Sequence, residues 1–151
     1  MKPWQFLKEL LDSKLNMLNL PKDEMAFRKI YLDLLEQEKI TTIFRPGKRD
    51  CGEVRGYCPS QLVTAKVLEN IGADWAEVPP KFIEGFSKNI VIKSAEVKKI
   101  KDFTNADFIG SSPEVHDIKS LKYHLGVIYN LSLSSLSDDA LVTKITFEYK
   151  K

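Results

Sequence analysis

Hydrophobic positions repeat with helical spacing over much of the first 38 residues. Residues 3–17 carry their apolar side chains on one face, which predicts an N-terminal helix packed on the outside of the fold. A second series follows Pro21, whose fixed φ suits the first position of a helix. This series predicts a helix from Pro21 to about Glu38, whose buried face would be formed by Phe27, Ile30, Tyr31, Leu34 and Leu35.

From residue 40 the pattern changes to β-branched and alternating residues. Strands are predicted over 40–45, 61–70, 89–103 with a bend near Ser94, and 140–150. The stretch 46–60 holds three glycines and two prolines and predicts an exposed loop. Residues 71–88 predict a long irregular connection, and residues 104–110 a short helical turn.

A further helix is predicted from about Pro113 or Ile118 to Tyr129. Its buried face would be formed by Ile118, Leu121, Leu125 and Ile128. The elements together predict an α+β fold, with a small mixed or antiparallel β-barrel flanked by helices. We expect residues 1–20 to be a helical extension and residues 21–151 to be one domain.

Composition narrows the class of protein. The chain has 151 residues, 43% of them hydrophobic, and a net charge of +2, so it is expected to be globular. No apolar run approaches the roughly 20 residues of a membrane span, and the first residues lack a signal-peptide pattern. We therefore expect a cytoplasmic protein without a membrane partner. Cys51 and Cys58 fit no familiar metal spacing with His116, so they are expected to be structural or incidental thiols, and no metal or cofactor is expected.

The first candidate for chemistry is Lys39 with Thr41 and Thr42. A desolvated lysine of lowered pKa can act as a base and activate a threonine hydroxyl as a nucleophile. The same residues also suit a solvated lysine at a helix end, followed by threonines with strand propensity. Residues three apart in a regular strand point to opposite faces, so Lys39 can meet Thr42 only from a turn before the strand.

Positive charge gathers in the neighbouring loop. Residues 39–55 hold two carboxylates, Asp50 and Glu53, against five cations, namely Lys39, Arg45, Lys48, Arg49 and Arg55. Cations clustered on a loop suit phosphate or a nucleotide backbone. A solubilising loop would have the same composition.

Two further features of the sequence could contribute to catalysis or to ligand binding. Glu114 follows Ser112 and Pro113, which together resemble the start of a helix; alternatively Asp117 caps that helix and leaves Glu114 free before it. Aromatic side chains could stack a base or pack in the core. The aromatic set is Trp75, Phe82, Phe86, Tyr123 and Tyr129.

Three segments resemble the ASCH domain, a member of the PUA-like superfamily of small β-barrels linked to RNA: FRKIYLDLLEQEKITTIFRPGKR, PEVHDIKSLKYHLGVIYNL and ALVTKITFEY. Within that family the chain is most similar to small bacterial amidohydrolases that act on N4-acetylcytidine. The resemblance implies a catalytic set of Lys39 as base, Thr42 as nucleophile and Glu114 as the carboxylate that protonates the leaving nitrogen or activates water. The sequence departs from the family pattern in its adjacent Thr41 and Thr42 and in Phe44 before the arginine.

The resulting expectation is a domain that binds RNA or a modified nucleoside or nucleotide in a basic pocket, with hydrolysis of an amide on an acylated cytidine as its activity. Arg45, Lys48 and Arg49 would hold anionic groups, and Tyr129 would border the pocket. Two alternatives stay open, a non-catalytic RNA-binding module and a ribonuclease of the same fold that needs no metal.

Overall fold

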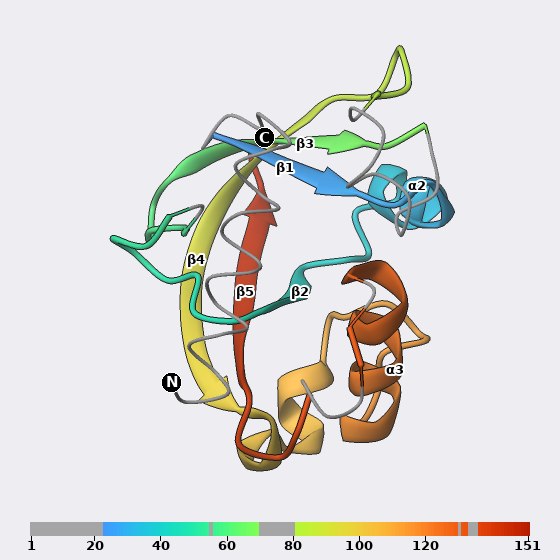
Figure 1. The fold of residues 1–151 in the computed structure, drawn as a ribbon. Coiled ribbons are helices and arrows are strands. Elements are labelled where there is room, and N and C mark those ends of the chain that lie inside the picture. Colours follow the sequence, from blue (N-terminus) through green and yellow to red (C-terminus); the bar gives the residue numbers. More distant parts are fainter. Residues whose placement is uncertain (1–22, 55, 70–80, 130, 133–135) are drawn as a thin grey trace.

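The computed structural model describes residues 23–54, 56–69, 81–129, 131–132 and 136–151. Within these ranges the chain forms five strands: β1 (Glu24–Phe27), β2 (Thr42–Pro46), β3 (Leu62–Val67), β4 (Lys88–Lys99) and β5 (Leu141–Tyr149). The described residues also form the α-helices α2 (Leu32–Glu36) and α3 (Ile118–Tyr129), and short 3-10 helices over Lys29–Tyr31, Ile100–Asp102 and Asn105–Phe108. In Figure 1 the sheet is strongly twisted, so that β1 and β3 run across the view while β4 and β5 run along it.

The strands form one mixed sheet in the order β1-β3-β4-β5-β2. β1 pairs with β3 in parallel, and the other neighbours are antiparallel. The predicted α+β class and the mixed sheet are therefore confirmed. The predicted barrel closure is not found, because among the described strands no ladder joins the two edges, β1 and β2.

Side chains nevertheless bridge the two edges of the sheet. The Arg45 guanidinium of β2 donates to the carbonyl oxygen of Ala26 in β1 at 3.0 Å. The hydroxyl of Tyr57, in the loop after β2, donates to the carbonyl oxygen of Glu24 at 3.1 Å. These two bonds bring the strand edges together without backbone pairing.

The predicted helix from Pro21 to Glu38 is wrong in its first half, where the described residues form β1. Met25 and Phe27 are buried and alternate with half-buried neighbours, which is strand periodicity inside the apparent helical series. The predicted buried Ile30 is 59% exposed. α2 then ends at Glu36, and Glu38 takes the left-handed conformation (φ 57°) of a helix C-cap.

The other predicted strands and α3 are found with shifted bounds, except that the end of the predicted strand 89–103 forms the 3-10 helix Ile100–Asp102 and that the predicted exposed loop 46–60 is partly buried. β4 carries a register shift between Ile92 and Ser94, next to the predicted bend. α3 begins at Ile118, because the Asp117 carboxylate accepts the backbone N–H of Ser120 at 2.7 Å and caps the helix. The predicted extension over residues 1–20 and most of the 71–88 connection lie outside the described residues.

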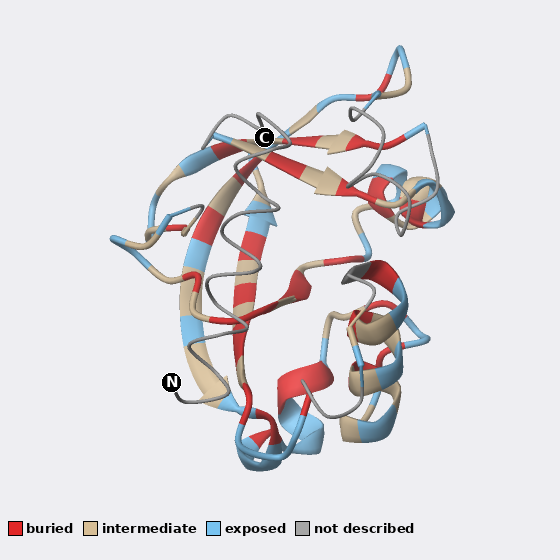
Figure 2. Cartoon of the chain, viewed as in Figure 1, coloured by how far each residue is buried: buried red, intermediate tan, exposed pale blue. Residues whose placement is uncertain are grey.

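Two hydrophobic clusters lie on opposite sides of β2. Phe44 packs with the apolar face of α3, whereas Ile43 packs with β1, α2 and the other strands. Neighbouring residues of a strand point to opposite faces, so β2 separates the two clusters. Figure 2 shows the buried residues gathered along the sheet and on the inner side of α3. The 3-10 helix Lys29–Tyr31 and α3 meet through the rings of Tyr31 and His124, whose centres lie 6.1 Å apart.

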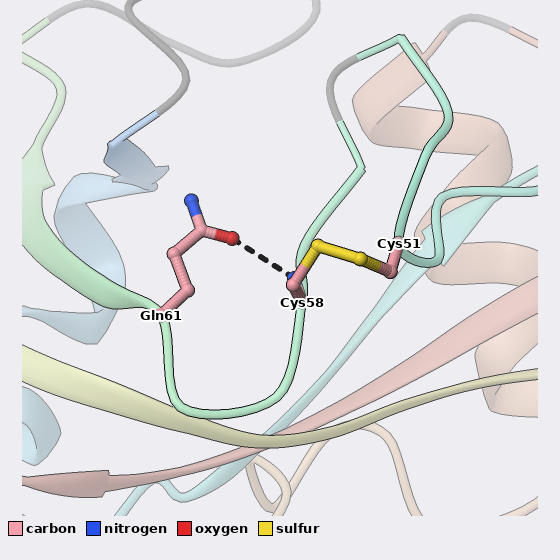
Figure 3. Close-up of a disulfide and its surroundings, with 3 residues drawn as sticks. All are labelled: Cys51, Cys58 and Gln61. Atoms are coloured by element: carbon pink, nitrogen blue, oxygen red, sulfur yellow. Dashed lines mark hydrogen bonds between the residues drawn. A yellow bond between two sulfur atoms is a disulfide. The ribbon is translucent and has the colours of Figure 1, made fainter.

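The loop after β2 contains a disulfide between Cys51 and Cys58, seven residues apart (Figure 3). The side-chain oxygen of Gln61 accepts the N–H of Cys58 at 2.9 Å and fixes the second cysteine. This pair corrects the prediction of two thiols, because the turn around Gly52 (φ 95°) folds the loop back on itself. Within the described part of the chain no helix is long and apolar enough to cross a membrane.

Candidate functional site

Three polar side chains from separate segments meet beside α3. The Tyr31 hydroxyl donates a hydrogen bond to Oε1 of Glu114. Nδ1 of His124 lies 3.3 Å from the same hydroxyl oxygen and 3.6 Å from Oε1 of Glu114. We call these three residues the Tyr31 cluster. Its chemistry is that of an oriented carboxylate with a phenol and an imidazole at its side.

The backbone explains why each group points into this cluster. Tyr31 ends the 3-10 helix Lys29–Tyr31 immediately before α2, with its ring buried. His124 sits on α3 beside the buried Leu125 and has 13% of its side chain exposed. Because Asp117 caps α3, Glu114 precedes the helix and is free to face Tyr31. Of the two alternatives for this segment, the structure shows the second: Asp117 caps α3, and the Glu114 carboxylate bonds Tyr31 ahead of the helix.

Burial shifts the proton equilibria of two members of the cluster. The pKa of His124 is lowered to about 4, chiefly by desolvation on burial; the charge of Glu114 opposes this shift, and the charges of Arg45 and Arg28 contribute to it. The imidazole is therefore neutral at pH 7, and its contact with Glu114 is not an ion pair. Burial, together with the hydrogen bond to Glu114, raises the pKa of Tyr31 well above its usual value, so the phenol keeps its proton.

Thr42 uses its hydroxyl within the fold. Its side chain is 2% exposed, and Oγ1 donates to the carbonyl oxygen of Ile109 at 3.0 Å. The backbone N–H groups of Thr41 and Thr42 both donate to the carbonyl oxygen of Gly110, at 2.9 and 3.1 Å. The adjacent threonines thus bind the turn that leads to Glu114.

Lys39 lies between the end of α2 and the start of β2. Its backbone N–H donates to Leu34 in the helix C-cap, and its side chain is exposed. Across the described ranges no hydrogen bond or ion pair connects Lys39, Thr42 and Glu114 with one another. The structure brings Glu114 together with Tyr31 and His124, and Thr42 together with the turn before Glu114. The catalytic roles of the three residues stay a prediction.

The cations predicted to hold anionic groups have different surroundings. Arg45 is half-buried, binds Ala26 as described, and its charge acts on His124. Lys48 lies 3.6 Å from Glu53, with 42% of its side chain exposed. Arg49 is 7% exposed, with its guanidinium 5.8 Å from the centre of the Tyr57 ring. Of these cations, Arg45 is the one whose charge reaches the Tyr31 cluster.

Some expected site residues lie outside the described part of the chain. The side chain of Tyr129 is one of them, as are Arg55 and Trp75. Tyr123 is 74% exposed, and Phe86 is buried in the core. In the residues that the structure describes, no group of three His, Cys, Asp or Glu side chains could hold a metal ion.

Sequence reasoning missed Tyr31 and His124 as site residues. Tyr31 stands in an apolar series that predicts packing, a role that its ring also fills. His124 carries no motif, although it stands at the border of the apolar face of α3. The available signal was that each carries a polar group next to buried positions, where such groups need a partner.

Comparisons with known proteins concern the fold. No family model matches the sequence, and no curated protein matches it. Protein EF3133 from Enterococcus faecalis, described with the family model DUF984, is 11% identical, with 95% of this chain and 89% of that chain covered and a TM-score of 0.51. The hypothetical protein PH0355 is 16% identical, with 84% and 97% covered and a TM-score of 0.49.

A third similar structure is an ASCH domain from Lactobacillus crispatus. It is 10% identical, with 95% of this chain and 94% of that chain covered and a TM-score of 0.48. At such low identity the likeness to EF3133 shows an α+β fold in common, and no activity follows from it.

Proposed function

We propose that the protein is an ASCH-type domain that binds RNA or a modified nucleoside or nucleotide at the Tyr31 cluster. The observation that carries this proposal is the carboxylate of Glu114, which is 46% exposed yet oriented by Tyr31. An oriented, accessible carboxylate can accept hydrogen bonds from the amino groups of bases. The sequence resemblance to ASCH domains, a family linked to RNA, supports the same class of ligand.

The charges around the cluster suit a ligand that carries phosphate. Arg28 and Arg45 both act on His124, which is itself neutral. Two cations therefore oppose the single charge of Glu114. This excess of positive charge favours a ligand that carries an anionic phosphate and places a neutral base against the Glu114 carboxylate.

Binding can be tested with short single-stranded RNA and with nucleoside monophosphates by calorimetry. We expect Glu114→Ala to weaken binding at least tenfold, and Glu84→Ala, at another exposed glutamate, to leave it unchanged. Affinity for RNA should fall as the salt concentration rises, because cations of the protein displace counterions from the phosphates and added salt opposes their release. Equal binding by both variants would exclude the Tyr31 cluster as the binding site.

A second proposal is that the site hydrolyses an amide on an acylated cytidine. It is supported by the position of Glu114, which faces the cluster instead of capping α3. In this reaction Lys39 would take the proton of the Thr42 hydroxyl, and the oxygen of Thr42 would attack the amide carbonyl. Glu114 would protonate the leaving nitrogen or activate the water that then releases the acyl group from Thr42 as a carboxylic acid. Full deacylation activity in Lys39→Ala or Glu114→Ala would rule out this set. Cleavage of RNA in the presence of a chelator would instead favour the ribonuclease alternative.

A further inference from the structure

The hydrogen bonds of the Tyr31 cluster determine where its protons lie. Tyr31 has one hydroxyl proton, and it is donated to Glu114, because a carboxylate is a stronger acceptor than an imidazole. Nδ1 of His124 lies 3.3 Å from the Tyr31 oxygen, which can then only accept. Nδ1 therefore carries the proton of the neutral ring, and Nε2 is left as an acceptor.

Glu114 also has acceptor capacity to spare. Oε1 accepts from Tyr31, and Oε2 has no hydrogen-bond partner among the residues that the structure describes. The side chain is 46% exposed, so both oxygens belong to a group that solvent and ligands can reach. An ionised carboxylate has about four lone-pair sites, of which the phenol takes one. The hydroxyl of Tyr31 also hydrogen-bonds Ser112, so the donors that the structure shows in this cluster are used within it, and Glu114 is the group that offers acceptors to a ligand.

A donor-rich ligand for this cluster has to be neutral where it meets Glu114. Arg28 and Arg45 act on His124 with positive charge and would repel an ammonium or guanidinium group. A neutral ring with adjacent N–H donors has no such penalty. An attached phosphate would be favoured by the same two arginines.

From this inventory of donors and acceptors we infer that Glu114, oriented by Tyr31, selects guanine among the nucleobases. This inference rests on the proposed binding function and specifies its ligand. Guanine presents N1–H and N2–H side by side, so both oxygens of one carboxylate can accept from it. Adenine and cytosine each place a ring acceptor beside their single amino group, and uracil flanks its one N–H with two carbonyl oxygens. For these three bases the second oxygen of Glu114 would face an acceptor.

The inference is tested by calorimetry at pH 7 with the monophosphates of guanosine, inosine, adenosine, cytidine and uridine. We expect guanosine monophosphate to bind roughly tenfold or more tightly than each of the others. Inosine is the sharpest comparison, because it lacks only the N2 amino group. Glu114→Gln keeps the size of the side chain but replaces one acceptor with a donor, and should abolish the preference for guanine.

The outcomes separate this inference from the proposal that it rests on. If all five nucleotides bind equally and Glu114→Gln binds them as the wild type does, guanine selection is wrong while binding stands. If none binds, guanine selection is wrong, and the titration with short RNA decides whether the proposed binding function stands. A nitrogen NMR correlation spectrum supplies an independent check, since it distinguishes Nδ1–H from Nε2–H. Finding the proton of His124 on Nε2 would overturn the inventory of donors and acceptors.

Discussion

The hydroxyl of Thr42 donates a hydrogen bond to the carbonyl oxygen of Ile109, with the two oxygens 3.0 Å apart. This bond ties the start of β2 to the turn that precedes Glu114. Thr42→Val keeps the shape of the side chain but leaves a buried acceptor without this partner, and should lower the free energy of unfolding by about 1–2 kcal/mol. Urea denaturation measures the loss.

Thr42→Ser is the matched control, because it retains the hydroxyl. The same variants also separate structure from catalysis. A loss of deacylation in Thr42→Val together with unchanged stability would show that the hydroxyl acts on substrate and that its bond to Ile109 contributes little to folding.

Gly110 has the left-handed φ of 84° and carries the carbonyl that receives both threonine amides. A Cβ at this position would overlap Oγ1 of Thr41. We expect Gly110→Ala to destabilise the fold by more than about 2 kcal/mol, because steric overlap adds to the unfavourable φ. Thermal unfolding would show this as a lower Tm.

Gly85 provides a matched control, because it has the same φ of 84° and a Cβ added there would meet nothing within 4 Å. Gly85→Ala therefore measures the loss of stability that comes from placing alanine at a positive φ, without steric overlap. Equal losses for the two variants would contradict the steric account, and Thr41→Ala should partly rescue Gly110→Ala if that account holds.

The neutral His124 makes stability depend on pH in the acidic range. Its pKa is about 4 in the folded protein, against about 6.5 in the unfolded chain. Between these values the unfolded state binds the extra proton, so stability is complete above pH 6.5 and falls as the pH drops toward 4. The loss should approach roughly 3 kcal/mol.

His124→Gln should flatten this part of the profile, measured as Tm against pH. NMR titration of the ring gives the pKa directly. A titration midpoint near 6.5 would contradict the buried, neutral imidazole.

The disulfide between Cys51 and Cys58 closes a short loop, so it restrains the unfolded chain modestly. Reduction, or the Cys51→Ser and Cys58→Ser pair, should lower the free energy of unfolding by about 2 kcal/mol. Tm with and without a thiol reductant measures the effect, and mass spectrometry counts the free thiols. Two free thiols in the purified oxidised protein would show that the bond does not form; in a reducing compartment, thiols are the expected state.

Residue patterns within single segments predicted the elements whose structure depends little on distant residues. The β-branched runs predicted β2 and β5, and the apolar spacing predicted the face of α3 with Leu121 and Leu125. β1 was missed because Phe27 fits a helical series and a strand series equally well, and pairing with β3, some 40 residues away, decided between them.

The candidate site was also predicted only in part, because some of its contacts join residues far apart in the sequence. Glu114 was found through the ASCH resemblance, whereas its partners depend on a fold that brings Tyr31 and His124 together from 93 residues apart. Neither residue carries a motif of its own. The pairing of Cys51 with Cys58 was likewise decided by the course of the loop, not by the spacing of the two cysteines.

The two bonds that span the sheet edges bear on how copies of this protein behave in a crowded solution. The carbonyl groups of Glu24 and Ala26 belong to an edge strand, where unpaired groups invite a strand from another molecule. Tyr57 and Arg45 already occupy these two acceptors. The chain thereby blocks the positions on β1 from which edge-to-edge polymerisation would start, and Arg45→Ala would expose one of them to aggregation.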